Sequence, residues 1–362
     1  MKKVIKSADG SLPLSEISAA VNEELKICVL QPGSDSSLAD VQTWCPTGID
    51  LLDLWTYGGV PIGRVWEIYG EPHHGKSALA IQLMVAVQRA GGLSVLLDAE
   101  GSVTKSRLDL FGHDPARHLY MNADSVEIGF KAIDTTLETV RVKCKLDIPI
   151  LFVWDTIAAS QTEHEKASDK YGDGMMSKPR LIREGLRRLS LELPRQQAGI
   201  VFVNQTMASM DQYSPIDTPG GKSLKFWSTY RIHVKKGGPF QPGGTDNGII
   251  SKMKMTKCKL GPPLRTIDLP LSYDKGWDND FANFNFLNRT DVTEATKAEI
   301  CRKGSYYYIL GFKNFCGGEG PDEIPLYASA LDDKIRAYPR LSEYLSHLTR
   351  KEWEASYPTS AR

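Results

Sequence analysis

Residues 65–89, VWEIYGEPHHGKSALAIQLMVAVQR, decide the fold of this chain. The stretch predicts an apolar strand, then a glycine-rich loop at 70–77, then an apolar helix that begins at Ser77. The loop GEPHHGKS matches the spacing GxxxxGK[ST], in which backbone N–H groups at a helix N-terminus converge on phosphate oxygens. The lysine of this pattern reaches the β- and γ-phosphates, and the hydroxyl coordinates Mg²⁺. We therefore expect a phosphate-binding loop that comprises Gly70, Glu71, Pro72, His73, His74, Gly75, Lys76 and Ser77.

The alternation of strand and helix continues along the chain. Short apolar strands are predicted at 94–98, 150–155 and 199–204, and helices at 128–143 and 179–193 lie between them. Buried strands that alternate with helices are typical of a parallel sheet covered on both faces. The central part of the chain is therefore predicted to be an α/β domain.

The spacing changes after residue 229, where strand patterns follow one another closely with Gly and Pro between them. We expect antiparallel strands that extend the sheet. Further on, a strand at 306–312 and a helix at 339–353 indicate a small separate domain. The antiparallel strands are predicted at 229–234, 249–259 and 265–271.

The N-terminal region predicts one amphipathic helix. Ile17, Val21 and Leu25 recur at a helical spacing, Ser15 is a candidate N-cap, and the polar stretch 31–40 has the composition of a linker. An apolar stripe of this kind must be buried, either on the chain's own core or on a neighbouring subunit, and the residues leave both alternatives open.

The composition excludes several classes of protein. The 362 residues are 41% hydrophobic and 24% charged, which argues against wholesale disorder and against a membrane protein. Lys plus Arg and Asp plus Glu both total 44, so the formal net charge is zero, and this first argues against a strongly basic nucleic-acid binder. Six cysteines without a CxxC pair do not suggest a disulfide framework or a zinc ribbon. No N-terminal apolar stretch indicates export, and we expect a cytoplasmic protein.

Polar side chains follow three of the predicted strands. Asp155 ends one strand, Glu100 lies just past another, and Gln205 follows a third. The carboxyl ends of parallel strands meet at the ligand crevice of such a sheet. There Asp155 could hold Mg²⁺, Glu100 could deprotonate an attacking water, and Gln205 could report the state of the γ-phosphate. Either acid alone could also be a solvated strand terminus, but the set favours ATP hydrolysis.

These motifs occur together and in the same order in the bacterial RecA recombinases, which this chain resembles over most of its length. The resemblance is specific from about residue 46 to residue 273. It rests on YGGVPIGRVWEIYGEPHHGKS at 57–77, DAE at 98–100, VWDTIAA at 153–159, VNQT at 203–206, the glycine pair at 220–221 with LKF at 224–226, and KCK at 257–259.

The resemblance implies a RecA-like P-loop ATPase core with a mostly parallel central sheet. Residues 46–275 would form this core, residues 1–45 a polymerisation helix and its linker, and residues 276–362 a small α+β domain. Two DNA-binding loops would span about 161–179 and 206–226.

The function implied by the resemblance is that of an ATP- and Mg²⁺-dependent recombinase. Such a protein forms a helical homo-oligomeric filament on single-stranded DNA, pairs it with homologous duplex DNA and exchanges strands, with DNA-dependent ATP hydrolysis. By residue, the resemblance assigns catalysis to Glu100, Lys76, Gln205, Lys257 and Lys259, the metal to Ser77 and Asp155, and the base of the nucleotide to Arg107. Lys257 and Lys259 would act across the subunit interface, although their strand could equally be a solvated basic edge.

DNA contacts are expected on one helix and two loops. Arg180, Arg183 and Arg187 share a helical face, while Glu184 and Arg188 are expected to pair at i,i+4. That face could also simply be solvated, and the loop methionines could either stack on bases or cover the core. The DNA-binding candidates are Met175, Met176, Arg180, Arg183, Arg187, Met207, Met210, Gly220, Gly221, Lys222 and Ser223. The subunit-interface candidates are Ile17, Val21, Leu25, Lys225 and Phe226.

Some residues depart from the family pattern. Arg107 stands where the family usually has an adenine-stacking tyrosine, and the C-terminus lacks an acidic tail. These departures suggest a divergent or phage-type member, at work in a bacterial cytoplasm or in that of an infected host. A ring-shaped DNA helicase with the same core and a non-catalytic recombination accessory protein are the competing hypotheses.

Overall fold

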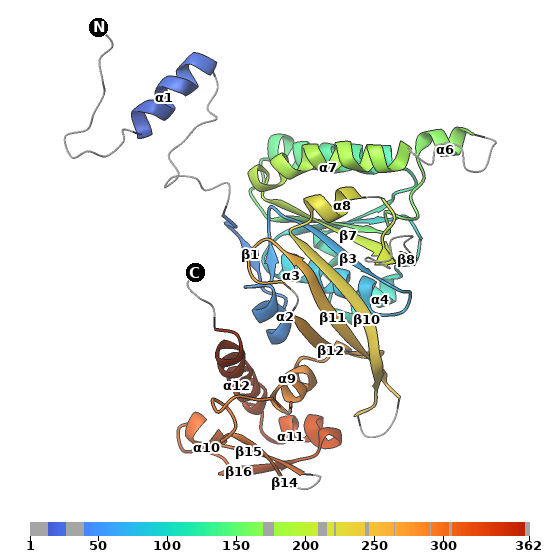
Figure 1. Cartoon of the computed structure of the whole chain (residues 1–362). Coiled ribbons are helices and arrows are strands. Elements are labelled where there is room, and N and C mark those ends of the chain that lie inside the picture. The colour runs from blue at the N-terminus through green and yellow to red at the C-terminus, as the bar shows by residue number, and fades with distance from the viewer. Residues whose placement is uncertain are drawn as a thin grey trace. The chain divides into compact units, whose positions relative to one another are not determined.

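The computed structural model in Figure 1 describes residues 14–26, 40–168, 177–208, 216–220, 222–242, 246–263, 265–289, 291–303 and 306–358. The chain divides into two compact units, residues 1–42 and residues 43–362. Within the described ranges, none of the helices combines the length and apolar character that crossing a bilayer demands.

The first unit contains one described helix, α1 (Leu14–Leu25). Its apolar stripe is exposed, with Ile17 at 45%, Val21 at 37% and Leu25 at 53% of full exposure. The prediction of an amphipathic helix is confirmed, but Ser15 is not its N-cap, because the helix begins one residue earlier and Ser15 lies in its first turn. The Ser15 carbonyl instead accepts a hydrogen bond from Ser18 Oγ (3.0 Å).

A nine-stranded sheet organises the second unit, in the order β13-β12-β11-β10-β3-β7-β6-β4-β5. The four predicted central strands are all present and parallel, and the antiparallel extension is confirmed. The strands are β3 (Val65–Gly70), β4 (Leu93–Asp98), β5 (His118–Asn122), β6 (Ile150–Asp155), β7 (Ala198–Gln205), β10 (Tyr230–Phe240), β11 (Gly248–Cys258), β12 (Thr266–Ser272) and β13 (Gly276–Trp277).

Alternation along the strands divides the core between the two faces of this sheet. In β6, Leu151 and Val153 pack into the cluster that holds α3 (Lys76–Arg89). Phe152 and Trp154 point to the opposite face, which α5 (Val126–Glu138) and α7 (Ser177–Arg195) cover. The predicted α/β class with helices on both faces is therefore confirmed.

Shorter elements join these layers, and the sequence patterns did not predict most of them because each spans only a few residues. They are β1 (Trp44–Cys45), α2 (Asp50–Trp55), β2 (Val60–Pro61), α4 (Lys105–Leu110), α6 (Glu163–Ala167), β8 (Met207–Ala208), β9 (Ile216–Asp217) and α8 (Lys222–Trp227).

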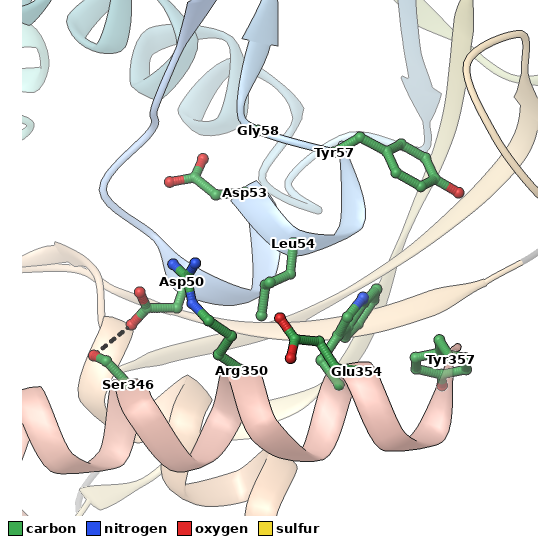
Figure 2. Close-up of a pocket in the computed structure, with 10 residues that line it drawn as sticks. Asp50, Asp53, Leu54, Tyr57, Gly58, Ser346, Arg350, Glu354 and Tyr357 are labelled. Atoms are coloured by element: carbon green, nitrogen blue, oxygen red, sulfur yellow. Dashed lines mark hydrogen bonds between the residues drawn. The ribbon is translucent and has the colours of Figure 1, made fainter. Parts of the chain in front are cut away.

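The C-terminal part has its own small core around a three-stranded antiparallel sheet. The predicted strand and helix appear there as β15 (Tyr306–Leu310) and α12 (Leu341–Ser356). Figure 2 shows where α12 meets α2: Ser346 Oγ donates a hydrogen bond to Asp50 (2.7 Å) beside a cavity of about 380 Å³. The other elements are α9 (Asn279–Leu287), β14 (Ile300–Lys303), α10 (Phe312–Phe315), β16 (Glu323–Leu326) and α11 (Leu331–Ala337).

Candidate nucleotide site and nucleic-acid interface

The glycine-rich loop joins β3 to α3 and passes close to the neighbouring antiparallel strands. A Cβ on Gly70 would lie 2.1 Å from the Val234 carbonyl oxygen, and a Cβ on Gly75 would lie 2.6 Å from Ser251 Oγ. Gly75 also has a positive φ of 96°, which favours glycine. Ser251 Oγ donates to the His74 carbonyl oxygen (2.8 Å) and so fixes the loop against β11. Glycine is thus required at these two positions because the loop lies close against β10 and β11. In a loop of this spacing the backbone N–H groups would bind the phosphate.

Lys76 is the buried cation of this loop. Its side chain is only 8% exposed, and Nζ donates to the Glu71 carbonyl oxygen (2.7 Å). Burial lowers the pKa of Lys76, while Asp155 and Glu100 oppose that shift. A buried ammonium with a neutral carbonyl as its hydrogen-bond partner is well suited to bind phosphate oxygens.

Asp155 and Ser77 form the candidate metal pair. Asp155 ends β6, is 2% exposed and is hydrogen-bonded to Ser77. Burial raises the pKa of Asp155 to about 6, with nearby Glu100 and Asp98 adding to the rise. A hydroxyl and a carboxylate oxygen are ligand types that Mg²⁺ prefers. The residues therefore fit the ion that the sequence predicted here.

Glu100 and Gln205 meet at the mouth of the site. Glu100 Oε1 accepts hydrogen bonds from Gln205 Nε2 (3.2 Å) and from Thr156 Oγ1 (3.0 Å). The three side chains come from the ends of β4, β7 and β6, as expected for strand ends at one edge of a parallel sheet. The structure thus brings together the carboxylate and the amide that the sequence analysis selected.

Asp98 supports the turn at the candidate site and was not selected as a site residue from the sequence. It is fully buried, and its carboxylate accepts hydrogen bonds from four successive N–H groups, among them those of Glu100 (3.2 Å) and Gly101 (2.8 Å). This arrangement fixes the turn that carries Glu100. An aspartate at the very end of an apolar strand, followed by a turn, was the available signal.

Arg107 lines a cavity of about 640 Å³ beside the phosphate loop. It lies on α4, which Thr104 caps through a hydrogen bond from the Arg107 N–H (3.3 Å). His73 of the loop and Tyr273 at the end of β12 line the same cavity. The expected place of Arg107 near the base is consistent with this position. Tyr273 was not predicted from the sequence, because nothing in the pattern around it links it to the loop.

The arginines of α7 are exposed as predicted, but one predicted ion pair is wrong. Arg180 Nε pairs with Glu184 (3.0 Å), whereas Arg188 turns across the helix interface to Asp134 of α5. Glu184 and Arg188 therefore do not pair at i,i+4. The hydrogen bond from Arg180 lowers the pKa of Glu184, and the charges of Arg183 and Arg187 add to this effect.

The two polar loops are only partly described. Met175, Met176, Met210 and Gly221 lie outside the described residues. Met207, in β8, is 51% exposed, and Gly220 has a positive φ of 94° just before α8, which contains Lys222 and Ser223.

The paired lysines lie at the C-terminal end of α8. Lys257 Nζ donates to the Phe226 carbonyl oxygen (2.7 Å) and to that of Lys225, and Lys259 Nζ donates to Trp227 (3.3 Å). Burial, with Lys259 and Arg231 nearby, lowers the pKa of Lys257 to about 8. The candidates for catalysis and for the subunit interface thus form one cluster, in which Phe226 is 68% exposed.

A basic face on β10 and β11 was not assigned to DNA by the sequence analysis. Lys235 lies opposite Lys252, whose Nζ is 3.7 Å from Asp268 Oδ2. Lys254 lies opposite His233, which is stacked on Tyr69 and adds no charge near neutral pH, because burial lowers its pKa to about 4. These side chains alternate with buried Met253 and its neighbours, so they project from the outer face of the sheet. The alternation in KMKMTKCK was the signal for this second basic surface.

Comparison with known proteins agrees with this geometry. The family described as RecA N-terminal domain matches residues 15–278. The chain belongs to the RecA family. Among its relatives, this RecA-family protein is 28% identical to Protein RecA of Arthrospira platensis over 84% of the chain and 80% of the relative. It is 29% identical to that of Thermotoga petrophila, over 78% and 76%, and 25% identical to that of Paracoccus denitrificans, over 92% and 91%. The resemblance inferred from the motifs is confirmed.

Proposed function

We propose that this RecA-family protein is an ATP-dependent recombinase that assembles on single-stranded DNA and exchanges that strand with a homologous duplex. The observation that carries the proposal is the pair of contacts between Glu100 and both Gln205 and Thr156, beside a buried Lys76. One carboxylate thereby connects the hydrolytic site to the start of a long polar loop.

The residues of the site divide the chemistry among them. The loop N–H groups and Lys76 would bind the phosphates of ATP, and Ser77 and Asp155 would hold Mg²⁺, which would supply positive charge beside the phosphate oxygens. Glu100 accepts the proton of the attacking water. Fixed by the Asp98 turn, Glu100 needs little reorganisation for that role.

Gln205 couples this chemistry to DNA. It is the last residue of β7, and the polar loop at 206–226 follows directly. The adjacent Asn204 donates from Nδ2 to the Pro219 carbonyl oxygen (2.9 Å) and to Glu67 (3.2 Å), so the segment that joins β7 to α8 is fixed to the sheet at its start and again at Pro219. A change in the Glu100–Gln205 contact is therefore transmitted to a segment that is anchored at these two points.

Two separate basic surfaces support binding of two DNA partners. Arg180, Arg183 and Arg187 are exposed on α7, and Lys235 and Lys254 are exposed on the outer face of the sheet. Phosphate contacts from Lys and Arg supply most sequence-independent affinity for DNA, so either surface can bind a DNA backbone. We assign the single strand to α7, because this helix begins at the end of the first predicted DNA-binding loop, and the incoming duplex to the sheet face. Self-assembly would use the exposed α1 stripe and the Lys257–Phe226 cluster.

ATP hydrolysis with and without single-stranded DNA tests the proposal. Glu100→Gln keeps the size of the side chain but removes the base, so DNA-stimulated turnover should fall about 100-fold or more while ATP is still bound. Lys76→Ala should abolish turnover. Glu138→Gln, an exposed carboxylate on α5, is the matched control and should retain activity.

Electron microscopy with single-stranded DNA and a non-hydrolysable ATP analogue tests the assembly. We expect helical filaments. Rings without filaments would show a ring-shaped motor instead, and full hydrolysis by the Lys76→Ala protein would remove the ATPase assignment altogether.

A further inference from the structure

The turn at 156–160, between β6 and α6, is tied to the core of the protein. Ile157 is fully buried in the cluster that α5 and α7 cover. Ser160 Oγ accepts a hydrogen bond from Trp154 Nε1 (2.9 Å) and donates one to the Ala123 carbonyl oxygen (2.9 Å). Buried and hydrogen-bonded groups of this kind make a segment rigid, so a displacement at one end of the turn reaches the other end.

The first residue of this turn contacts the candidate hydrolytic site. Thr156 is 2% exposed, and its Oγ1 donates to Glu100 Oε1 (3.0 Å) and accepts from the Ala159 N–H (3.2 Å). The Ala159 N–H also donates to the Thr156 carbonyl oxygen (3.1 Å), which closes the turn. The position of the turn therefore helps to set the position of the Glu100 carboxylate.

The same turn is bonded to the first turn of helix α7. Lys178 donates from Nζ to the Ala158 carbonyl oxygen (2.5 Å). Its side chain is half-buried, and burial lowers the pKa of Lys178 while Glu165 opposes that shift. Arg180, two residues further along the helix, is exposed instead and pairs with Glu184 (3.0 Å). Lys178 thus links the basic helix to the turn, whereas its neighbour on the helix faces solvent.

We propose that Lys178 is a positioning residue, which transmits the binding of DNA on α7 to Glu100 through the turn at 156–160. This route does not pass through Gln205. Glu100 Oε1 accepts hydrogen bonds from both Gln205 and Thr156, so two separate segments fix one carboxylate oxygen. The inference rests on the proposed function, because it takes α7 as a DNA-binding surface and Glu100 as the base.

DNA-stimulated ATP hydrolysis by the full-length protein tests the proposal. Lys178→Met removes the donor but keeps an unbranched side chain, so the stimulation of kcat by saturating single-stranded DNA should fall about tenfold, a common size for coupling between sites. Basal hydrolysis and the KM for ATP should change by less than about twofold, because neither depends on bound DNA. Lys178→Arg keeps a donor and should recover most of the stimulation. Lys131→Met, the same change at an exposed lysine of α5, is the matched control.

Equilibrium binding to single-stranded DNA at several salt concentrations distinguishes positioning from direct contact. Lys178→Met should have the same slope of log K against log salt as the wild-type protein, because Lys178 is bonded to a main-chain carbonyl oxygen rather than to phosphate. A slope less steep by about 0.7 would show that Lys178 neutralises a phosphate, and this overturns the proposal.

A second substitution interrupts the same route at Thr156. Thr156→Val removes the hydroxyl that donates to Glu100, so DNA should stimulate hydrolysis less in this variant as well. Adding Lys178→Met to Thr156→Val should cause little further loss of stimulation, because two residues of one route are not additive. A double variant in which the two losses multiply would overturn the proposal.

The outcomes separate this inference from the proposed function. If DNA stimulates the wild-type protein and stimulates Lys178→Met equally well, the route through Lys178 is overturned alone. It is also overturned if Lys178→Met loses basal and stimulated hydrolysis in the same proportion, because the residue would then support the fold rather than the coupling. A wild-type protein whose ATP hydrolysis does not respond to DNA overturns both the inference and the proposed function.

Discussion

At the residue scale, His118 makes the stability of this protein sensitive to acid. Its Nδ1 is bonded to Ser94 Oγ (2.9 Å), its ring contacts His113 edge-on, and burial lowers its pKa to about 4. Between pH 6.5 and pH 4, His118 is protonated in the unfolded chain but neutral in the folded chain. His118 therefore does not reduce the free energy of unfolding above pH 6.5, and it reduces this free energy progressively as the pH falls toward 4.

The corresponding experiment compares the free energy of unfolding in urea at pH 7 and pH 5. The wild-type protein should lose on the order of 2 kcal/mol more than His118→Gln over this interval. Equal losses in the two proteins would show that His118 does not carry the pH dependence.

A buried ion pair also lies beneath the candidate site. Glu67 is fully buried, accepts from Asn204 and pairs with Arg231, whose guanidinium lies 4.5 Å from the centre of the Tyr69 ring. Arg231→Met leaves the Glu67 carboxylate buried without its charge partner, and unfolding should become easier by about 3 kcal/mol.

The control is Arg336→Met, which breaks an exposed pair with Asp333 and should change stability by less than about 0.5 kcal/mol. Replacing both members of the buried pair, with Glu67→Gln and Arg231→Met, should recover part of the stability. If the Arg231→Met protein were as stable as wild type, water rather than Arg231 would satisfy Glu67.

At the scale of elements, helix α7 carries a local excess of positive charge, although the net charge of the whole chain is zero. Arg183 lies on the exposed face of this helix beside Arg180 and Arg187. If it binds a phosphate, Arg183→Ala should weaken binding to single-stranded DNA. The slope of log K against log salt should also become less steep by about 0.7 for each phosphate that the protein no longer neutralises.

Arg188→Ala is the matched control, because Arg188 is on the same helix but is paired with Asp134 of α5. Its salt slope should stay close to that of wild type. An unchanged slope for Arg183→Ala would make this face of α7 a solvated surface.

How much of the fold could be predicted from the sequence depended on the kind of secondary-structure element. Strands such as β6 form unbroken apolar runs, and their pattern alone predicted a parallel sheet. Strand β5 was missed because it is an edge strand, in which Leu119 and Tyr120 are about half exposed and no apolar run marks it. The Glu184–Arg188 pair was predicted from helical spacing alone, whereas the structure offers Arg188 a partner on another helix.

Some residues of the candidate site could be predicted from the sequence and others could not. Strand-end residues such as Asp155 and Gln205 follow from the topology of a parallel sheet. Tyr273 and Asp98 depend on how distant segments pack and how one turn is bonded, and spacing along the chain carries neither kind of information.

At the scale of the whole molecule, a net charge of zero is compatible with DNA binding if many subunits act together. The exposed stripe on α1 is the natural contact for such assembly. Val21→Glu should abolish long filaments on single-stranded DNA, as seen by electron microscopy, because a charge would have to be buried at the contact.

Residues 43–362 form their own compact unit, so the main unfolding transition of Val21→Glu should match that of wild type. Glu24→Gln, an exposed polar change on the same helix, should leave the filaments intact. Filaments of normal length in the Val21→Glu protein would place the subunit contact elsewhere.

The central position of β3 in the sheet has a consequence for how the chain folds. Its strand partners are far away in sequence: the Asn204–Glu67 bond spans 137 positions and the Arg231–Glu67 bond spans 164. Contacts of such high sequence separation form late and slowly. A ribosome must therefore synthesise about two thirds of the protein before the phosphate loop can take its final shape, and nucleotide binding during translation would mark the moment at which the sheet closes around β3.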